Sequence, residues 1–161
     1  MDYALSNVDI NKLVKEVDKK GANIENTDDI KKNTPIEKIF KNRGHTILFH
    51  DWKEGDEIGH WVAMLRNPKN EVMLFDSLAT PINELNPDLK QFFKNNGIKE
   101  LIINRKQYQN EDNSTCGRYA VLIVALSKLG LDFRQIIDFM DKLKGSDGTF
   151  DEGVLNITEA K

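Results

Sequence analysis

The chain has 161 residues, of which 39% are hydrophobic and 30% charged, which is enough for one globular domain with a buried core over residues 1–161. Its formal net charge of -3 gives no basic field, so we expect neither strong nucleic-acid binding nor a membrane partner. The single cysteine, Cys116, cannot form an intramolecular disulfide, which is typical of a reducing compartment.

The first half of the chain predicts one helix, one buried strand and a hairpin. Its opening residues have no signal-peptide pattern, and no apolar run nears the ~20 residues that span a bilayer, so we expect a soluble intracellular protein. The segment "SNVDINKLVKEVDKK" has apolar residues at helical spacing behind Ser6 or Asn7 as N-cap. Residues 20–35 are polar and turn-rich, and "HTILFH" at 45–50 predicts a buried strand. "HWVAMLR" and "EVMLFDS", joined by "NPKN", predict the hairpin.

The second half predicts three helices and one more strand. "NELNPDLKQFFKNNG" is typical of a helix that ends at Gly97, and "IKELIINRK" of a strand. "CGRYAVLIVALSK" is apolar on nearly every side, which predicts a buried helix with Ser114 or Thr115 as N-cap. "LDFRQIIDFMDKLKG" predicts a last amphipathic helix, and residues 146–161 a loosely held tail. This mixed order favours an α+β domain in which helices flank a small sheet.

The hairpin brings a histidine and an aspartate to the same edge of the predicted sheet. If Met64 pairs with Val72, strand alternation places His60 directly opposite Asp76. Directly opposed residues have Cβ atoms ~5 Å apart, so the carboxylate can accept a hydrogen bond from the imidazole. A slip of one residue in this register would reverse the faces, so the predicted pair depends on the turn.

Cys116 stands at the start of the predicted buried helix, where free N–H groups and the helix dipole favour a thiolate. We therefore predict that Cys116 attacks a carbonyl, that His60 takes its proton and later protonates the leaving amine, and that Asp76 fixes the imidazole tautomer. Gly117 lets a substrate backbone approach closely. Trp61 packs beside the histidine and shields it from water, and with Gly117 it makes up the predicted substrate-binding residues.

An oxyanion donor is expected upstream of the cysteine, in "QYQNEDNSTC". A side-chain amide from Gln107 or Gln109, together with the backbone N–H of Cys116, would form an oxyanion hole. In an extended chain the two glutamines point the same way, so alternation does not choose between them. Their separation from Cys116 favours Gln109, because the chain can then leave the strand, place an amide near the sulfur and still enter the helix.

The order "GHWVAML…LFDS…YQNEDNSTCGRYA" resembles a group of cysteine peptidases. That group includes the adenovirus endopeptidase (adenain), the SUMO-specific proteases, and the maturation proteases of large DNA viruses, virophages and virus-like transposons. Its pattern is a histidine, usually followed by tryptophan, then an acid on the next strand, a glutamine, and Cys-Gly, and the match spans residues 45–130. The resemblance implies a papain-like core in permuted order, with the nucleophile at the N-terminus of a buried helix, and it also points to Gln109.

The short chain resembles the compact viral and virophage enzymes more than the larger SUMO-specific ones. The resemblance implies an endopeptidase that cuts capsid precursors next to small residues such as glycine during virion maturation. Such an enzyme would act in the host cytoplasm or viral factory, or packaged in the virion. Two alternatives remain: an isopeptidase that removes a ubiquitin-like modifier, and a non-catalytic binding module of the same fold. Acyl transfer would need an acyl-coenzyme A site, for which the sequence has no motif.

Cofactors and activators are not indicated. We expect no metal, since a zinc site formed by His45, His50 and Asp51 has poor ligand spacing and number. Adenain is activated by a disulfide-linked peptide and by DNA, but this chain has no second cysteine to bind such a peptide. With 26 acidic and 23 basic residues, we expect DNA to be at most a weak activator. The sequence leaves the oligomeric state open.

Overall fold

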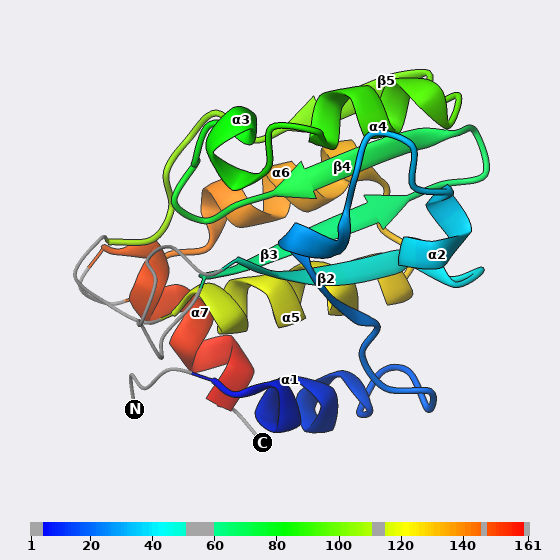
Figure 1. Ribbon diagram of the computed structural model, residues 1–161. Helices are drawn as coiled ribbons and strands as arrows, with labels where there is room; N and C mark the ends of the chain where they lie inside the picture. The colour runs from blue at the N-terminus through cyan, green and yellow to red at the C-terminus, as the bar shows by residue number, and fades with distance from the viewer. Residues whose placement is uncertain (1–4, 51–59, 111–114, 146–147, 160–161) are drawn as a thin grey trace.

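A five-stranded mixed sheet forms the centre of the chain (Figure 1). The computed structural model describes residues 5–50, 60–110, 115–145 and 148–159. The strand order is β1-β2-β3-β4-β5. The two inner pairings, β2 with β3 and β3 with β4, are antiparallel, and the two outer ones are parallel. The strands are β1 (Ile24–Asn26), β2 (His45–His50), β3 (His60–Arg66), β4 (Glu71–Phe75) and β5 (Glu100–Ile103).

Helices cover both faces of this sheet and bury two separate cores. In Figure 1, α1 and α5 lie below the strands, and α3 and α4 lie above them. Alternate residues of β3 serve the two cores: Trp61, Ala63 and Leu65 face α5, whereas Val62 and Met64 face the opposite layer. This confirms the predicted α+β architecture. The helices are α1 (Asn7–Val14), α2 (Ile36–Phe40), α3 (Ile82–Leu85), α4 (Leu89–Asn95), α5 (Cys116–Lys128), α6 (Phe133–Lys142) and α7 (Phe150–Glu159), with a short 3₁₀ helix η1 (Thr27–Asp29).

The hairpin of β3 and β4 forms, but the predicted register is wrong. The structure pairs Met64 with Leu74, not with Val72, so the ladder is displaced by two residues and the faces are kept. Arg66 pairs with Val72, so the turn holds two more residues than predicted, and within it the Asn67 side-chain oxygen accepts the Lys69 and Glu71 N–H groups at 3.0 and 3.1 Å. Hence His60 does not lie directly opposite Asp76.

The predicted helix in "NELNPDLKQFFKNNG" is two short helices, α3 and α4, separated at Asn86. Pro87 disfavours the helical conformation for the residue before it, and Asn86 is extended, with φ -166° and ψ 120°. The Asn86 amide nitrogen also donates to the carbonyls of Thr27 and Ile30 at 2.7 and 2.9 Å. These distant partners, in a segment where we predicted only turns, explain why the helix breaks there.

The C-terminal segment differs most from the sequence expectation. Instead of a loosely held tail, Phe150–Glu159 forms helix α7. Val154 is fully buried in the same core as α5, and Asp151 is buried as well. The tail prediction is therefore wrong for this helix, because its anchoring residues contact parts of the chain that local periodicity does not reveal.

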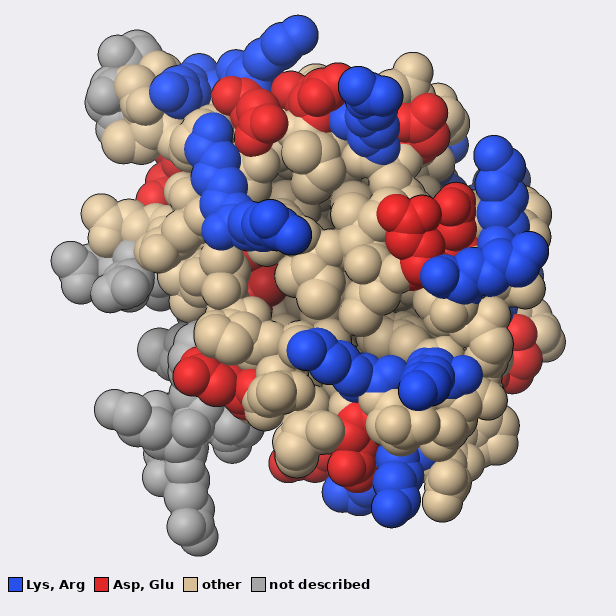
Figure 2. Space-filling model, turned by 90° about the horizontal axis from the view of Figure 1, so that it is seen from above, with Lys and Arg blue, Asp and Glu red and all other residues tan. Residues whose placement is uncertain are grey.

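The surface charges and the helix lengths indicate whether nucleic acid or a membrane could be a partner. On the face shown in Figure 2, Lys and Arg side chains are spread among Asp and Glu. Ion pairs among the described residues include Arg66 with Glu37 at 2.7 Å and Lys41 with Glu25 at 2.6 Å. Among the residues that the structure describes, no helix has both the length and the apolar character needed to cross a membrane.

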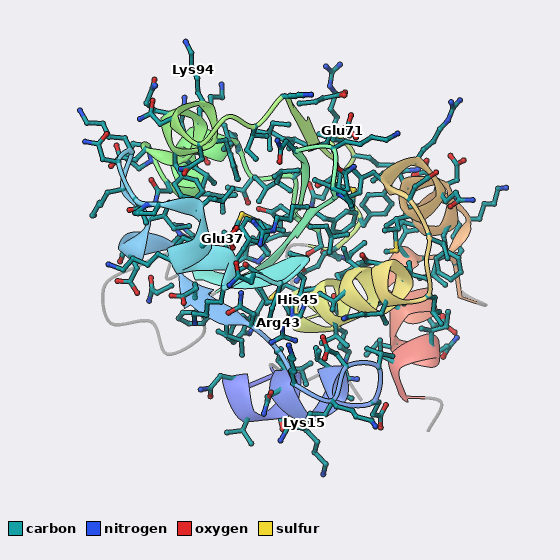
Figure 3. The ribbon with its side chains drawn as sticks, turned by 90° about the vertical axis from the view of Figure 1, so that its right-hand side faces the viewer. Lys15, Glu37, Arg43, His45, Glu71 and Lys94 are labelled. Atoms are coloured by element: carbon teal, nitrogen blue, oxygen red, sulfur yellow. The ribbon has the colours of Figure 1, made fainter. Side chains whose placement is uncertain are left out.

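His45 is a buried histidine that stabilises the start of β2 in its neutral form. Its Nε2 accepts a hydrogen bond of 3.1 Å from the backbone N–H of Asn23. Burial, reinforced by the positive charge of Arg43, lowers its pKa from 6.5 to about 4. Figure 3 labels both side chains, where the chain enters β2. A protonated imidazole could not accept the Asn23 hydrogen bond, so acid should weaken the fold at this point.

We predict that the free energy of unfolding falls as the pH drops from 6.5 to 4. His45 binds its proton near pH 6.5 in the unfolded chain but only near pH 4 in the folded one. Between these two values the folded state therefore loses about 3 kcal/mol of stability from this residue, and above pH 6.5 it loses none. Denaturant unfolding at several pH values measures the effect. In His45→Gln the amide oxygen can replace Nε2 without titrating, and this part of the slope should vanish. Equal slopes in the two proteins would contradict the assignment.

Candidate active site

A buried histidine and aspartate meet at the ends of β3 and β4. His60 is the first residue of β3, and Asp76 follows the last residue of β4. The His60 Nε2 atom lies 2.5 Å from Asp76 Oδ1, and the two side chains are 2% and 1% exposed. The same carboxylate oxygen accepts the Leu78 N–H at 2.8 Å. The predicted pair therefore exists in the structure, although a different strand register brings it together.

Asn104, which sequence reasoning missed, holds the backbone on both sides of the aspartate. Its side-chain oxygen accepts the Asp76 N–H at 2.8 Å, and its nitrogen donates to the Asp76 carbonyl at 2.7 Å. Asn104 follows β5, which runs parallel to β4, so the ends of both strands reach the same edge of the sheet. The sequence signal that could have revealed Asn104 is a polar residue directly after a predicted strand.

Cys116 is the first residue of α5, and its side chain contacts the histidine. The cysteine is a free thiol and is 7% exposed. Burial lowers the pKa of His60, but hydrogen bonds with Asp76 and Cys116 outweigh it and raise that pKa to about 9. Because Nε2 faces Asp76, Nδ1 is the ring atom left for the sulfur. At neutral pH the ring is thus an imidazolium between the Asp76 carboxylate and the Cys116 sulfur.

The entry to α5 differs in detail from the predicted cap. Thr115 is the N-cap residue, but its side chain makes no capping hydrogen bond. Its hydroxyl instead donates to Asp151 at 2.8 Å. Ser114, the other predicted cap, lies outside the described residues. The first turn of α5 is therefore anchored by a residue of α7.

The structure distinguishes the two candidate glutamines. Gln109 is 3% exposed, and its side-chain oxygen accepts the Ser77 hydroxyl at 2.6 Å. Its backbone N–H donates to the Ser77 carbonyl at 2.9 Å. Gln107 is exposed, and its amide nitrogen donates to the Gln109 carbonyl at 2.8 Å. The buried Gln109 is thus tied to the residue that follows Asp76, with its amide nitrogen directed away from Ser77.

Trp61 and Gly117 lie against each other. The Trp61 ring nitrogen donates to the Leu5 carbonyl at 3.0 Å, and the ring centroid lies 4.8 Å from that of Phe49. A Cβ on Gly117 would lie 3.1 Å from Leu5 Cβ and 3.2 Å from Trp61 Cδ1. The glycine thus lets α5 approach Trp61 closely, so its space is filled by Leu5 and Trp61 rather than open to substrate. Contact of either residue with a substrate stays a prediction.

Two of the residues considered for a zinc site, His45 and His50, form hydrogen bonds with other residues. His45 binds Asn23, and the His50 Nδ1 atom lies 3.1 Å from the Thr27 hydroxyl. Asp51 lies outside the described residues. Within the described parts of the chain, no cluster of three or more His, Cys, Asp or Glu residues could hold a metal ion. The absence of a cofactor stays a prediction.

Comparison with known proteins identifies the fold. No family model matches the chain, and no curated protein matches it. Among solved structures, the pS273R protease of ASFV matches with a TM-score of 0.54 at 15% identity, covering 96% of this chain and 66% of that one. Its selenomethionine form matches with a TM-score of 0.51 at 14% identity, covering 94% and 66%. ChlaDub1 from Chlamydia trachomatis matches with a TM-score of 0.52 at 11% identity, covering 94% and 73%.

These likenesses extend over nearly the whole of this chain, whereas the chain spans just under two thirds of the length of pS273R. At such low sequence identity, these matches show a shared fold. The structure and the comparisons confirm the predicted fold class: the chain has the papain-like α+β fold that it shares with the pS273R protease and with ChlaDub1.

Proposed function

We propose that the chain is a thiol-dependent hydrolase that cleaves peptide or isopeptide bonds, with Cys116 as its nucleophile. The observation that carries this proposal is the buried series in which Asp76 binds His60 and His60 binds Cys116. Its three members come from the ends of three elements, as a nucleophile, a proton carrier and an orienting group require. The cysteine-peptidase fold supports the same conclusion.

The reaction follows from this arrangement. The Cys116 sulfur attacks the substrate carbonyl, and the His60 imidazolium donates its proton to the leaving amine, giving a thioester. The neutral ring then takes a proton from water, whose oxygen attacks the thioester carbon. The C–S bond breaks, the acid is released, and the unprotonated Cys116 sulfur is again beside the His60 imidazolium. Asp76 holds the ring in one orientation throughout. The Gln109 amide and the Cys116 backbone N–H donate to the oxygen that becomes negative in both steps.

We infer that the substrates are viral structural precursors, cut next to small residues such as glycine. Support comes from the likeness of nearly the whole chain to a viral protease and from the sequence resemblance to compact maturation enzymes. Such a substrate places the enzyme in the host cytoplasm or viral factory, or inside the virion. The mixed surface charges and the paired Arg66 and Lys41 accord with a protein partner and with DNA as at most a weak activator.

Incubation of the enzyme with capsid precursors encoded by the same genome tests this proposal. Mass spectrometry should find new termini after small residues with the wild-type chain and none with Cys116→Ala, which removes only the sulfur. A second arm uses vinyl-sulfone probes built on ubiquitin-like modifiers. Labelling of Cys116 by such a probe at low concentration, without precursor cleavage, would favour the isopeptidase alternative. Neither cleavage nor labelling of the folded chain would favour the non-catalytic binding module.

The two glutamines should differ sharply in their kinetic effects. Gln109→Ala removes the proposed oxyanion donor, and we expect turnover to fall on the order of 10²- to 10³-fold. Gln107→Ala is the matched control, since it removes an exposed amide from the same loop, and it should lose much less. Steady-state kinetics of both variants on one peptide decide the matter. If Gln107→Ala loses most of its turnover and Gln109→Ala does not, then Gln109 is not the oxyanion donor.

Asp76→Asn should lower the pKa of His60. The substitution removes the carboxylate charge while the burial that lowers this pKa remains, so the ring should titrate well below its wild-type value of about 9. In the wild type, His60 stabilises the fold at pH values below 6.5, and this contribution is lost as the pH rises through 9. NMR titration of the ring protons measures both proteins. An unchanged His60 pKa in a folded Asp76→Asn variant, together with unchanged turnover, would remove Asp76 from the site.

A further inference from the structure

Asp151, on helix α7, is a buried carboxylate with donors from two other parts of the chain. It is 9% exposed. Its Oδ2 atom accepts the backbone N–H of Asn110 at 2.8 Å. Its Oδ1 atom accepts the hydroxyls of Thr115 and Tyr119 at 2.8 and 2.9 Å. Burial and the neighbouring Asp151 charge raise the pKa of Tyr119, so its hydroxyl stays protonated and remains a donor.

The positions of these donors relate Asp151 to the proposed chemistry. Asn110 directly follows Gln109, and Thr115 directly precedes Cys116. One carboxylate therefore binds the neighbour of the oxyanion donor with one oxygen and the neighbour of the nucleophile with the other. The separation of these two groups depends on where the Asp151 side chain lies.

Neighbouring contacts keep the start of α7 in place. The Phe150 ring lies edge-on to Tyr108, with centroids 5.0 Å apart, and Lys106 lies over Phe150 at 4.7 Å. The Tyr108 hydroxyl donates to Asp141 of α6 at 2.5 Å. The strand-exit segment that leads to Gln109 is thus fixed by α6 and α7 together, and Asp151 is the residue that links it to α5.

We propose that Asp151 is a positioning residue that sets the distance between Gln109 and Cys116. The inference rests on the proposed function, because a fixed distance matters only if both groups act on one carbonyl. An oxyanion donor must lie within hydrogen-bond distance of the oxygen as its charge develops, and a displacement of ~1 Å can cost on the order of 10²-fold in rate. The C-terminal helix is then part of the catalytic arrangement.

Asp151→Asn tests the proposal with an almost unchanged side-chain shape. The amide can direct its single oxygen either at the Thr115 and Tyr119 hydroxyls or at the Asn110 N–H. Its NH₂ group then faces the other side, so the charge-assisted bonds that the carboxylate accepts from both segments are lost. The connection between the segment carrying Gln109 and the start of α5 is thereby weakened. On a fluorogenic peptide amide with glycine before the scissile bond, we expect kcat to fall about 10- to 100-fold. Alkylation of Cys116 by iodoacetamide, which forms no oxyanion, should be unchanged.

A double-mutant cycle separates positioning from mere stability. If Asp151 acts through Gln109, Asp151→Asn should cost little further activity in a Gln109→Ala background. An equal loss of kcat in both backgrounds would overturn the proposal. Thr115→Val, which removes one hydroxyl and keeps the shape, provides a second variant with the same expected coupling to Gln109 should Asp151→Asn not fold.

Val154→Ala is the matched structural control. Val154 is fully buried on the same helix, so its truncation should lower the melting temperature while leaving kcat unchanged. A kcat loss in Val154→Ala equal to that in Asp151→Asn would overturn the specific role of Asp151. A folded wild-type chain that neither cleaves the peptide amide nor reacts with a peptide aldehyde would instead overturn the proposed function, and with it this role. An active wild type beside a fully active Asp151→Asn would contradict the positioning role alone.

Discussion

The buried ion pair between His60 and Asp76 is the constraint on which the rest of the site depends. Charges removed from water cost several kcal/mol each unless partners compensate for the lost hydration. Here the compensation comes from a direct 2.5 Å contact, from the Leu78 N–H, and from the Cys116 side chain. The second carboxylate oxygen of Asp76 is buried with no hydrogen-bond partner among the described residues, so its negative charge adds to the field that keeps the ring protonated.

The surrounding strands and helices hold His60, Asp76 and Cys116 at fixed distances. Strand β3 is the middle strand of the sheet and packs against α5, so the same contact fixes the positions of His60 and Cys116. Gly117 permits that contact by leaving room for the Trp61 ring. Asn104 fixes the backbone of Asp76 from β5, and Asp151 fixes the first turn of α5 from α7. Each catalytic candidate is therefore held by a residue from a different element.

The sequence predicted the parts of this arrangement that depend on local pattern. Alternation on β3, the polar residue after β4 and the polar entry to α5 were enough to single out His60, Asp76 and Cys116. The parts that it missed depend on distant partners or on turn geometry. The hairpin register followed from hydrogen bonds to the Asn67 side chain, and the break at Asn86 from bonds to a segment far back in the chain. The sequence predicts a tail in place of helix α7, because its short apolar pattern does not reveal the donors that bind the Asp151 carboxylate.

The central claim is that His60 controls the reactivity of Cys116, and the pH dependence of cysteine alkylation tests it most directly. With iodoacetamide, the wild-type chain should react rapidly and almost independently of pH while His60 is charged, up to its pKa of about 9. In His60→Ala the rate should be low at neutral pH and rise only near pH ~8.5, as for an ordinary thiol. Superimposable pH profiles for the two folded proteins would contradict the account.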